Sequence, residues 1–287
     1  MTNLRIGVPS KGRLAEIAGE LLKEAGLSFR RPERSLFARC REMPIDMTFL
    51  RTEDIPVLCS EGAIDMGITG SDLVAEHGQK DLCRLALGVG HCRLAVCVAE
   101  DSHFNKRADL SGARIATSFP HSTRSFLANN GLDPNRIVTL SGSVEIMITL
   151  GIADAIVDLI ETGSTLAANR LRVLAVISQH EAVLIQNYSL EHGEHAELAN
   201  RVARRLEGVV IARNYSLLEY NIPRAKLAEA ETITPGFESP TVSALEDPDW
   251  CAVRVMAKRD EVIAIMERLE TLGASAILET RITNCRL

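Results

Sequence analysis

A short turn, Thr162-Gly163-Ser164-Thr165-Leu166, combines hydroxyl groups, a glycine and the start of a predicted helix. Free backbone N–H groups at a helix start, with hydroxyls beside them and a glycine that permits close approach, bind a phosphate without a lysine. Asp158 and Glu161 lie just before the turn, at the end of the apolar segment 155–159, where acidic groups suit ribose hydroxyls or Mg²⁺. The residues therefore predict a sugar-phosphate site. The alternative is an ordinary turn capped by Thr162.

The plan of this turn occurs a second time, earlier in the chain. Residues 62–72 contain a helix-ending glycine, an aspartate that enters a strand, and the turn Thr69-Gly70-Ser71. Residues 151–166 have the same three features, and the two Thr-Gly-Ser turns lie 93 residues apart. Ligands bind at the carboxyl ends of parallel strands, so one turn in each of two lobes would place both turns in one cleft. Chance similarity between short glycine-containing turns is the alternative.

Basic residues follow other predicted strands. Lys11-Gly12-Arg13 lies where the first strand gives way to a helix, and Arg51 follows the strand that ends at Leu50. Any one of these charges could be ordinary solvated surface. Their recurrence at strand ends favours binding of a polyanion.

Other nucleotide and hydrolase signatures do not occur in the sequence. There is no G-x-x-x-x-G-K-[ST] segment and no G-x-S-x-G elbow, and residues 88–93 lack the third glycine of a dinucleotide fingerprint. His192 and His195 are spaced like a metal pair, but no third ligand accompanies them, so solvated surface is the better interpretation.

Composition limits the class of protein. The 287 residues are enough for two or three compact units, and a net charge of -6 with one Trp and three Tyr argues against a nucleic-acid binder. Seven scattered cysteines without a C-x-x-C pair indicate free thiols in a cytosolic protein. Residues 1–5 lead into an apolar segment and lack the regions of a signal peptide, and no run approaches the roughly 18 apolar residues of a membrane span.

Short apolar strands alternate with helical patterns through most of the chain, which predicts an α/β fold with mainly parallel sheets. Residues 85–99 are strand-like with little helix and are expected to cross between lobes. The segments 173–177 and 182–186 would return the chain to the first lobe. The expected strands are 4–8, 66–69, 114–117, 137–140 and 155–159, and the expected helices are 14–25, 122–130, 144–150, 166–170 and 194–206.

The pattern changes after Pro223. Strands at 241–244 and 251–257, a helix capped by Asp260, and a strand at 276–281 follow in the order β-β-α-β, which is typical of a small ferredoxin-like regulatory module. We place a domain boundary near residue 213.

The residues around the second turn resemble the signature of the ATP phosphoribosyltransferase family, the first enzymes of histidine biosynthesis: Glu145, Gly151, Ala153, Asp154, Asp158 and Thr162 to Leu166. Similar segments occur at 9–14, 54–56, 67–70 and 92–94, and the likeness runs from the first strand to the last. The tail, with 234–241 and 273–276, resembles the long form of the family, which carries a histidine-sensing C-terminal domain. One departure is Glu161, where a small residue is expected, so its side chain should point away from the phosphate or toward Mg²⁺.

The resemblance implies a two-lobed core similar to periplasmic binding proteins, followed by an ACT-like domain. Lobe I would comprise residues 1–98 and 179–213, lobe II with the phosphoribosyl donor site residues 99–178, and the histidine-binding domain residues 214–287. It also implies a cytoplasmic enzyme that needs Mg²⁺, is inhibited by L-histidine, and assembles as hexamers in exchange with dimers. Neither a nucleic acid nor a membrane is expected as a partner.

The reaction that the family implies joins N1 of the ATP adenine to C1 of phosphoribosyl pyrophosphate, with inversion at C1. The turn Thr162-Gly163-Ser164-Thr165-Leu166 would hold the donor's 5-phosphate beside Glu161, and Glu145 and Asp158 would hold ribose hydroxyls or Mg²⁺ as catalytic groups. Residues expected on the ATP and pyrophosphate side are Lys11, Gly12, Arg13, Arg51, Thr69, Gly70 and Asp72, and those expected around regulatory histidine are Thr241, Gly273, Ala274, Ser275 and Ala276.

Two other functions stay open on the residues alone. The core could be a module that senses a nucleotide or sugar phosphate without turning it over, although acidic groups beside the phosphate turn favour an enzyme. It could also be a phosphoribosyltransferase that uses a different acceptor base.

Overall fold

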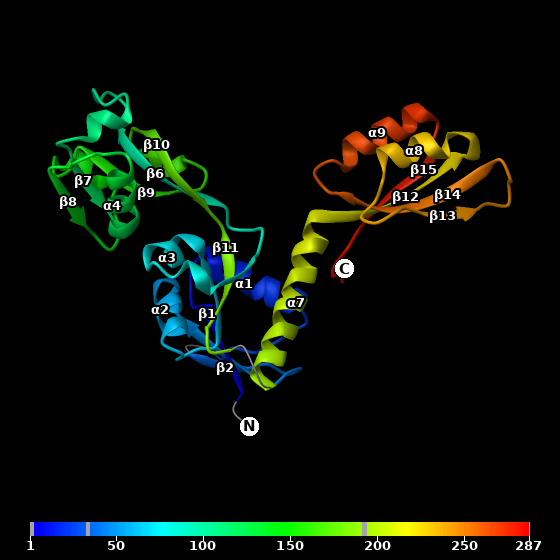
Figure 1. The fold of residues 1–287 in the computed structure, drawn as a ribbon, viewed down its shortest axis with the longest axis horizontal. Helices are drawn as coiled ribbons and strands as arrows, with labels where there is room; N and C mark the ends of the chain where they lie inside the picture. Colours follow the sequence, from blue (N-terminus) through cyan, green and yellow to red (C-terminus); the bar gives the residue numbers. More distant parts are fainter. Residues whose placement is uncertain (1–2, 33–34, 191–193, 287) are drawn as a thin grey trace. The chain divides into compact units, whose positions relative to one another are not determined.

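The computed structural model describes residues 3–32, 35–190 and 194–286. They form two compact units, one built from residues up to Glu20 and from Leu27–Ala203, the other from Leu21–Gly26 and from Arg204 onward. The first unit contains two separate sheets, and we call each sheet with its helices a lobe (Figure 1).

Lobe I is built on a six-stranded sheet in the order β2-β3-β1-β4-β11-β5. Strands β1, β3 and β4 are parallel, and β11 runs antiparallel between β4 and β5. The strands are β1 (Leu4–Pro9), β2 (Phe37–Arg39), β3 (Ile45–Leu50), β4 (Met66–Gly70), β5 (Cys83–Ala86) and β11 (Ala182–Gln186). The helical segments are α1 (Arg13–Glu24), η1 (Thr52–Asp54), α2 (Ile55–Ser60), α3 (Ser71–Glu76) and η2 (Lys80–Leu82).

Lobe II is built on a five-stranded sheet in the order β10-β6-β9-β7-β8. Strands β7, β8 and β9 are parallel, and β6 runs antiparallel between β9 and β10. The strands are β6 (Cys92–Ala99), β7 (Arg114–Thr117), β8 (Arg136–Thr139), β9 (Ala155–Ile160) and β10 (Leu171–His180). The helical segments are η3 (Arg107–Leu110), α4 (Pro120–Asn129), α5 (Ile146–Thr149) and α6 (Ser164–Ala168).

The two sheets share one strand plan. Three parallel strands, one antiparallel strand and an edge strand follow in the order β3-β1-β4-β11-β5 in lobe I and β8-β7-β9-β6-β10 in lobe II. The similarity between residues 62–72 and 151–166 is therefore more than chance, because β4 and β9, the strands within these segments, hold equivalent positions.

An arginine–aspartate clamp explains part of the repeated motif. Asp65, just before β4, accepts hydrogen bonds from the backbone N–H of Arg5 at 2.7 Å and from its guanidinium at 2.8 and 3.2 Å. Asp154, just before β9, accepts the same three bonds from Arg114 at 2.6 to 3.0 Å. Each arginine also donates to the carbonyl of a helix-ending glycine, Gly62 or Gly151. The aspartate of the motif is thus a structural group that fixes two parallel strands side by side.

We expect Asp154→Asn to lower the free energy of unfolding by about 1–2 kcal/mol, because it weakens the clamp and the Asp154 side chain is 32% exposed. Bonding by Arg114 lowers the pKa of Asp154, so the carboxylate stabilises the fold above its unfolded pKa and loses this effect as pH falls through the folded pKa. The difference in Tm between wild type and variant should therefore shrink on acidification. A difference that does not change with pH would contradict this role.

The first crossing between the lobes falls within the expected segment 85–99 but before the lobe boundary predicted after residue 98. Strand β6 pairs with β9 and β10, so residues 92–98 belong to the lobe II sheet rather than to lobe I, and the chain crosses between Ala86 and Cys92. A buried apolar strand has the same sequence pattern in either sheet, so only its pairing with other strands shows to which lobe it belongs. The return crossing falls at Glu181, between β10 and β11 and close to the predicted position.

The second unit contains a four-stranded antiparallel sheet in the order β13-β14-β12-β15. Figure 1 shows α8 and α9 on one face of it, and Val262, Ile265 and Leu269 of α9 are buried with the strands. Helix α7 (Glu194–Asn214) begins in the first unit and ends in the second. The other elements of the second unit are β12 (Tyr215–Pro223), η4 (Arg224–Lys226), α8 (Leu227–Ile233), β13 (Thr241–Ala244), β14 (Trp250–Lys258), α9 (Val262–Leu272) and β15 (Ser275–Arg281).

This module is larger than its predicted β-β-α-β pattern, because β12 and α8 come before it and complete a ferredoxin-like β-α-β-β-α-β order. Helix α7 also continues past Leu206, where it was expected to end, to Asn214. The predicted α/β fold class, a two-lobed core followed by a C-terminal ferredoxin-like domain, is confirmed. Within the described residues, no helix has the length and apolar character needed to cross a membrane.

Candidate active site

A cavity of about 280 Å³ lies between the two lobes, at the carboxyl ends of strands from both sheets. Gly70 and Asp72 line it from the turn after β4, and Leu159 and Glu161 line it from the end of β9. Residues of the first Thr-Gly-Ser turn and Glu161, which precedes the second, thus line one cavity, whereas Thr162, Gly163 and Ser164 do not line it. Arg13, at the start of α1, lines the same cavity.

The lobe I wall is tightly constrained. Thr69 is fully buried, and its hydroxyl donates to the carbonyl of Thr52 at 3.1 Å, so this side chain fixes the turn. A Cβ on Gly70 would lie 2.0 Å from Oδ1 of Asp72, which means that only glycine leaves room for this carboxylate. Burial raises the pKa of Asp72, and a protonated His180 would act in the opposite direction.

Lobe II carries two neighbouring carboxylates, Asp158 and Glu145, which do not themselves line the cavity. Asp158 in β9 is half-buried and accepts a hydrogen bond from the N–H of Leu159 at 2.8 Å. Burial raises the pKa of Asp158, and the negative charge of Glu145, at the start of α5, raises it further. The two acids predicted to act together are thus close enough to interact, and Asp158 is held in surroundings that disfavour its charge.

The predicted phosphate turn is open to solvent at its polar residues. Gly163 has a φ of +82°, a conformation that favours glycine, and directly precedes α6. The Thr162 and Ser164 hydroxyls lie 3.0 Å apart, and both side chains are exposed. Leu166 differs from its neighbours, because it is buried in the apolar core of lobe II and anchors the turn.

The predicted basic residues are exposed at the strand ends of lobe I. Arg13 forms an ion pair with Glu161 across the cavity, so a group predicted for ATP or pyrophosphate meets the acidic residue beside the phosphate turn. Lys11, Gly12 and Arg51 are exposed nearby in sequence but do not line the cavity.

Sequence reasoning missed several groups at this site. Glu53, Phe119 and Glu181 also line the cavity. Arg31 donates to the carbonyl of Ser10 at 3.0 Å and lies over the ring of Phe49, which places another cation near the end of β1. No sequence pattern identifies Arg31, because it lies in a segment without helical or strand periodicity.

Acidic oxygen atoms at the cavity are the ligands that a divalent cation such as Mg²⁺ prefers. Among the described residues, no group of three or more His, Cys, Asp and Glu side chains could hold a metal ion. The assignment of Glu145 and Asp158 as metal ligands stays a prediction. His192 lies outside the described residues, so the spacing of His192 and His195 remains a sequence observation.

The residues predicted for histidine lie in the second unit. Thr241 begins β13 at one edge of the four-stranded sheet, whereas 273–276 lie at the start of β15, at the opposite edge. Gly273 has a φ of +99° and ends α9, and Ala274 packs partly buried against the core. Within one chain these two groups are separated by the width of the sheet.

The sequence pattern of the family described as ATP phosphoribosyltransferase matches residues 51–208, and that of HisG, C-terminal domain matches residues 212–284. A relative in Rhodopirellula baltica named ATP phosphoribosyltransferase is 62% identical over 286 residues, 99% of this chain and 94% of that protein. One of the same name in Mycobacterium tuberculosis is 39% identical over 284 residues and 99% of both chains. A solved structure described as the ATP phosphoribosyl transferase (HisG:HisZ) complex from Thermotoga maritima has a TM-score of 0.61 and 27% identity, over 71% of this chain and 98% of that one.

Proposed function

This chain belongs to the ATP phosphoribosyltransferase family, and on that premise we propose that it transfers the 5-phosphoribosyl group of phosphoribosyl pyrophosphate to N1 of the ATP adenine. It is a transferase of the first step of histidine biosynthesis. The products would be N1-(5-phosphoribosyl)-ATP and pyrophosphate.

The observation that carries this proposal is the cavity lined by the ends of both repeated motifs. Two polyanionic substrates that react with each other need two binding walls that face one space. Gly70 and Asp72 provide one wall and Leu159 and Glu161 the other, with Arg13 bridging them.

We assign the donor to lobe II. Thr162, Ser164 and the exposed backbone of the turn would bind the 5-phosphate, with Gly163 providing the conformation that lets the backbone approach. Glu145 and Asp158 would hold ribose hydroxyls and a divalent metal, which we take to be Mg²⁺. Such an ion supplies charge neutralisation to a departing pyrophosphate.

We assign ATP and the pyrophosphate to the lobe I side. Arg13, Lys11 and Arg51 are cations at the carboxyl ends of β1 and β3, where they would neutralise phosphate charge. The turn 69–72 would contact the adenylate. Binding of either substrate would compete with the Arg13–Glu161 ion pair and free Arg13 for phosphate.

The chemistry requires little from a general base, because N1 of adenine already carries a lone pair. Catalysis would come from holding N1 in line with C1 and from stabilising the charges that develop as the bond to pyrophosphate breaks. The carboxylate of Asp158, on the ribose side, would stabilise positive charge that develops on the sugar.

We further propose that L-histidine inhibits the enzyme by binding in the C-terminal domain, at Thr241 and at Gly273 to Ala276. Because these two groups lie at opposite edges of one sheet, a site that uses both needs two copies of the chain. This supports assembly as a homo-oligomer, which we take to be a hexamer in exchange with dimers. The seven free cysteines are consistent with a cytoplasmic enzyme.

Ser275→Phe is expected to weaken inhibition by L-histidine about tenfold or more, because the larger side chain fills the space for the amino acid. Ser275 is exposed at the start of an edge strand, so the fold should tolerate the change. Turnover without histidine should stay at the wild-type level. Unchanged inhibition in the full-length variant would contradict the placement of the site, since allostery requires a distinct site.

The reaction is tested by incubating the full chain with ATP, phosphoribosyl pyrophosphate and Mg²⁺ and following the absorbance of the adduct. We expect adduct formation that depends on all three. Binding of both substrates without product would indicate a sensor instead.

A further inference from the structure

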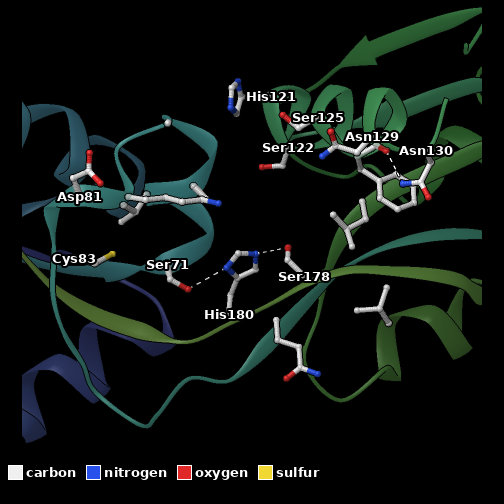
Figure 2. A pocket seen from close by; sticks show the side chains of 18 of the residues that line it. Ser71, Asp81, Cys83, His121, Ser122, Ser125, Asn129, Asn130, Ser178 and His180 are labelled. Atoms are coloured by element: carbon white, nitrogen blue, oxygen red, sulfur yellow. Dashed lines mark hydrogen bonds between the residues drawn. The ribbon is translucent and has the colours of Figure 1, made fainter. Parts of the chain in front are cut away.

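His180 lies where the chain passes from the lobe II sheet to the lobe I sheet. It is the last residue of β10, and β11 begins two residues later. Figure 2 shows its ring between two serine hydroxyls: Nδ1 lies 3.0 Å from Oγ of Ser71, and Nε2 lies 2.7 Å from Oγ of Ser178. The imidazole therefore links the first residue of α3 in lobe I to strand β10 of lobe II.

Ser71 is held by this crossing segment at three points. Besides His180, its N–H donates to the carbonyl of Glu181 at 2.9 Å, and its hydroxyl accepts from the N–H of Glu181 at 3.2 Å. Ser71 lies directly between Gly70 and Asp72, which line the cavity assigned to the substrates. A shift of the crossing segment would therefore move the turn that we assign to the adenylate.

One protonation state satisfies every group in this chain of bonds. The Glu181 N–H donates to Ser71 Oγ, the Ser71 hydroxyl then donates to Nδ1, and the Nε2–H of a neutral imidazole donates to Ser178 Oγ. Burial lowers the pKa of His180 by more than the negative charge of Asp72 raises it, and the positive charge of Lys80 lowers it further, in agreement with the neutral ring that the bonds require.

We propose that His180 is a positioning residue that couples lobe II to the ATP-binding turn 69–72 through Ser71 and Ser178. The inference rests on the proposed function, because it takes that turn to contact ATP. His180 is absent from the cavity assigned to the substrates. It lines a second cavity of about 910 Å³ together with Ser71, Ser178 and His121, and a third of about 600 Å³ together with Ser71 and Glu161.

The test compares His180→Leu, His180→Gln and His121→Leu in the full chain, with direct measurement of the ATP Kd as well as steady-state kinetics. His180→Leu should raise the ATP Kd about fivefold to tenfold, since it removes both bonds, and should change the KM for the donor by less than twofold. His180→Gln keeps one donor and one acceptor and should recover most of the affinity. His121→Leu, in the same cavity, should match wild type.

Ser178→Ala should also weaken ATP binding, although Ser178 lies in the lobe II sheet. The double variant Ser178→Ala, His180→Leu should have the same ATP Kd as His180→Leu alone, because the hydrogen bonds through His180 are already lost. Wild-type ATP affinity in His180→Leu, or an equal loss of ATP and donor affinity with a lower Tm, would overturn the proposal. A wild-type chain that binds ATP but forms no adduct would refute the proposed reaction, and the ATP Kd of the variants would still decide the role of His180.

Discussion

Asp158→Asn should reduce kcat by about 100-fold or more, because it removes a negative charge from the place where positive charge develops on the ribose. The backbone bond from Leu159 to Oδ1 can persist in the variant, since an amide oxygen also accepts. The fold should therefore be retained. Initial rates of adduct formation at saturating ATP and donor measure the effect, and wild-type rates would refute the assignment.

Asp154→Asn is a matched control for this change. It alters an aspartate just before β9, but one that serves the clamp with Arg114 rather than the cavity. We expect it to lower Tm and to keep kcat within a few-fold of wild type. Equal losses of kcat in both variants would indicate that the strand, rather than the Asp158 carboxylate, matters for catalysis.

The two variants should also change Tm in opposite directions, upward for Asp158→Asn and downward for Asp154→Asn. Because burial raises the pKa of Asp158, its ionised form destabilises the fold at neutral pH. Asp158→Asn should therefore raise Tm above the folded pKa, and the gain should vanish as pH falls below the unfolded pKa of about 3.9. Such an increase in stability with a loss of rate is expected where a carboxylate is placed for function.

Gly163→Val should raise the KM for phosphoribosyl pyrophosphate about tenfold to a hundredfold, because the turn could no longer bring its backbone N–H groups against the 5-phosphate. A valine at a φ of +82° is strained by about 1–2 kcal/mol even though the space around the glycine is open. The KM for ATP should change little. Unchanged donor affinity would contradict the turn as the phosphate site.

Gly112→Val controls for backbone strain. Gly112 lies in the same lobe, has a φ of +77° and also faces open space, but lies outside the predicted phosphate turn. It should lose a similar amount of stability and keep the wild-type KM for the donor. A comparable rise in donor KM would show that strain in lobe II, rather than loss of the phosphate contact, explains Gly163→Val.

Much of the two-lobed core is predictable from the sequence because its signals are local. Glycines that end helices and buried apolar strands mark β4 and β9 with only a few neighbouring residues. The clamp was not predictable, because Arg5 and Asp65 are 60 residues apart and Arg114 and Asp154 are 40 apart. The motif indicated the aspartates, and only the fold shows their partners.

Two elements were not fully predicted, β12 and the last part of α7. Both carry polar or glycine residues at positions that the fold buries. In β12 the inward positions are Ser216, Leu218, Tyr220 and Ile222. The serine disturbs the apolar alternation, and it is satisfied by a bond to Glu279 in β15. Helix α7 was expected to end at Leu206 but continues through Gly208, where a Cβ would lie 2.0 Å from the carbonyl oxygen of Cys285, so the helix uses glycine to admit the C-terminal segment.

The motifs indicated part of the lining of the cavity, since Gly70 belongs to the first Thr-Gly-Ser turn and Glu161 precedes the second. The roles of the residues in the second turn stay predictions. The roles of Thr69 and Leu166 were not predictable, because a buried hydroxyl bonded to the backbone and a core leucine follow from packing. Glu53 and Phe119 reach the cavity only through the tertiary fold.

The most direct test of the central claim is an acceptor comparison with the wild-type chain, Mg²⁺ and phosphoribosyl pyrophosphate. ATP, free adenine and other free bases would be supplied separately, and the products identified by mass and by the position of the ribosyl bond. We predict a product with ATP alone, joined at N1 and formed with one pyrophosphate per adduct. A product with another base and none with ATP, or binding of ATP and donor without any product, would contradict the account.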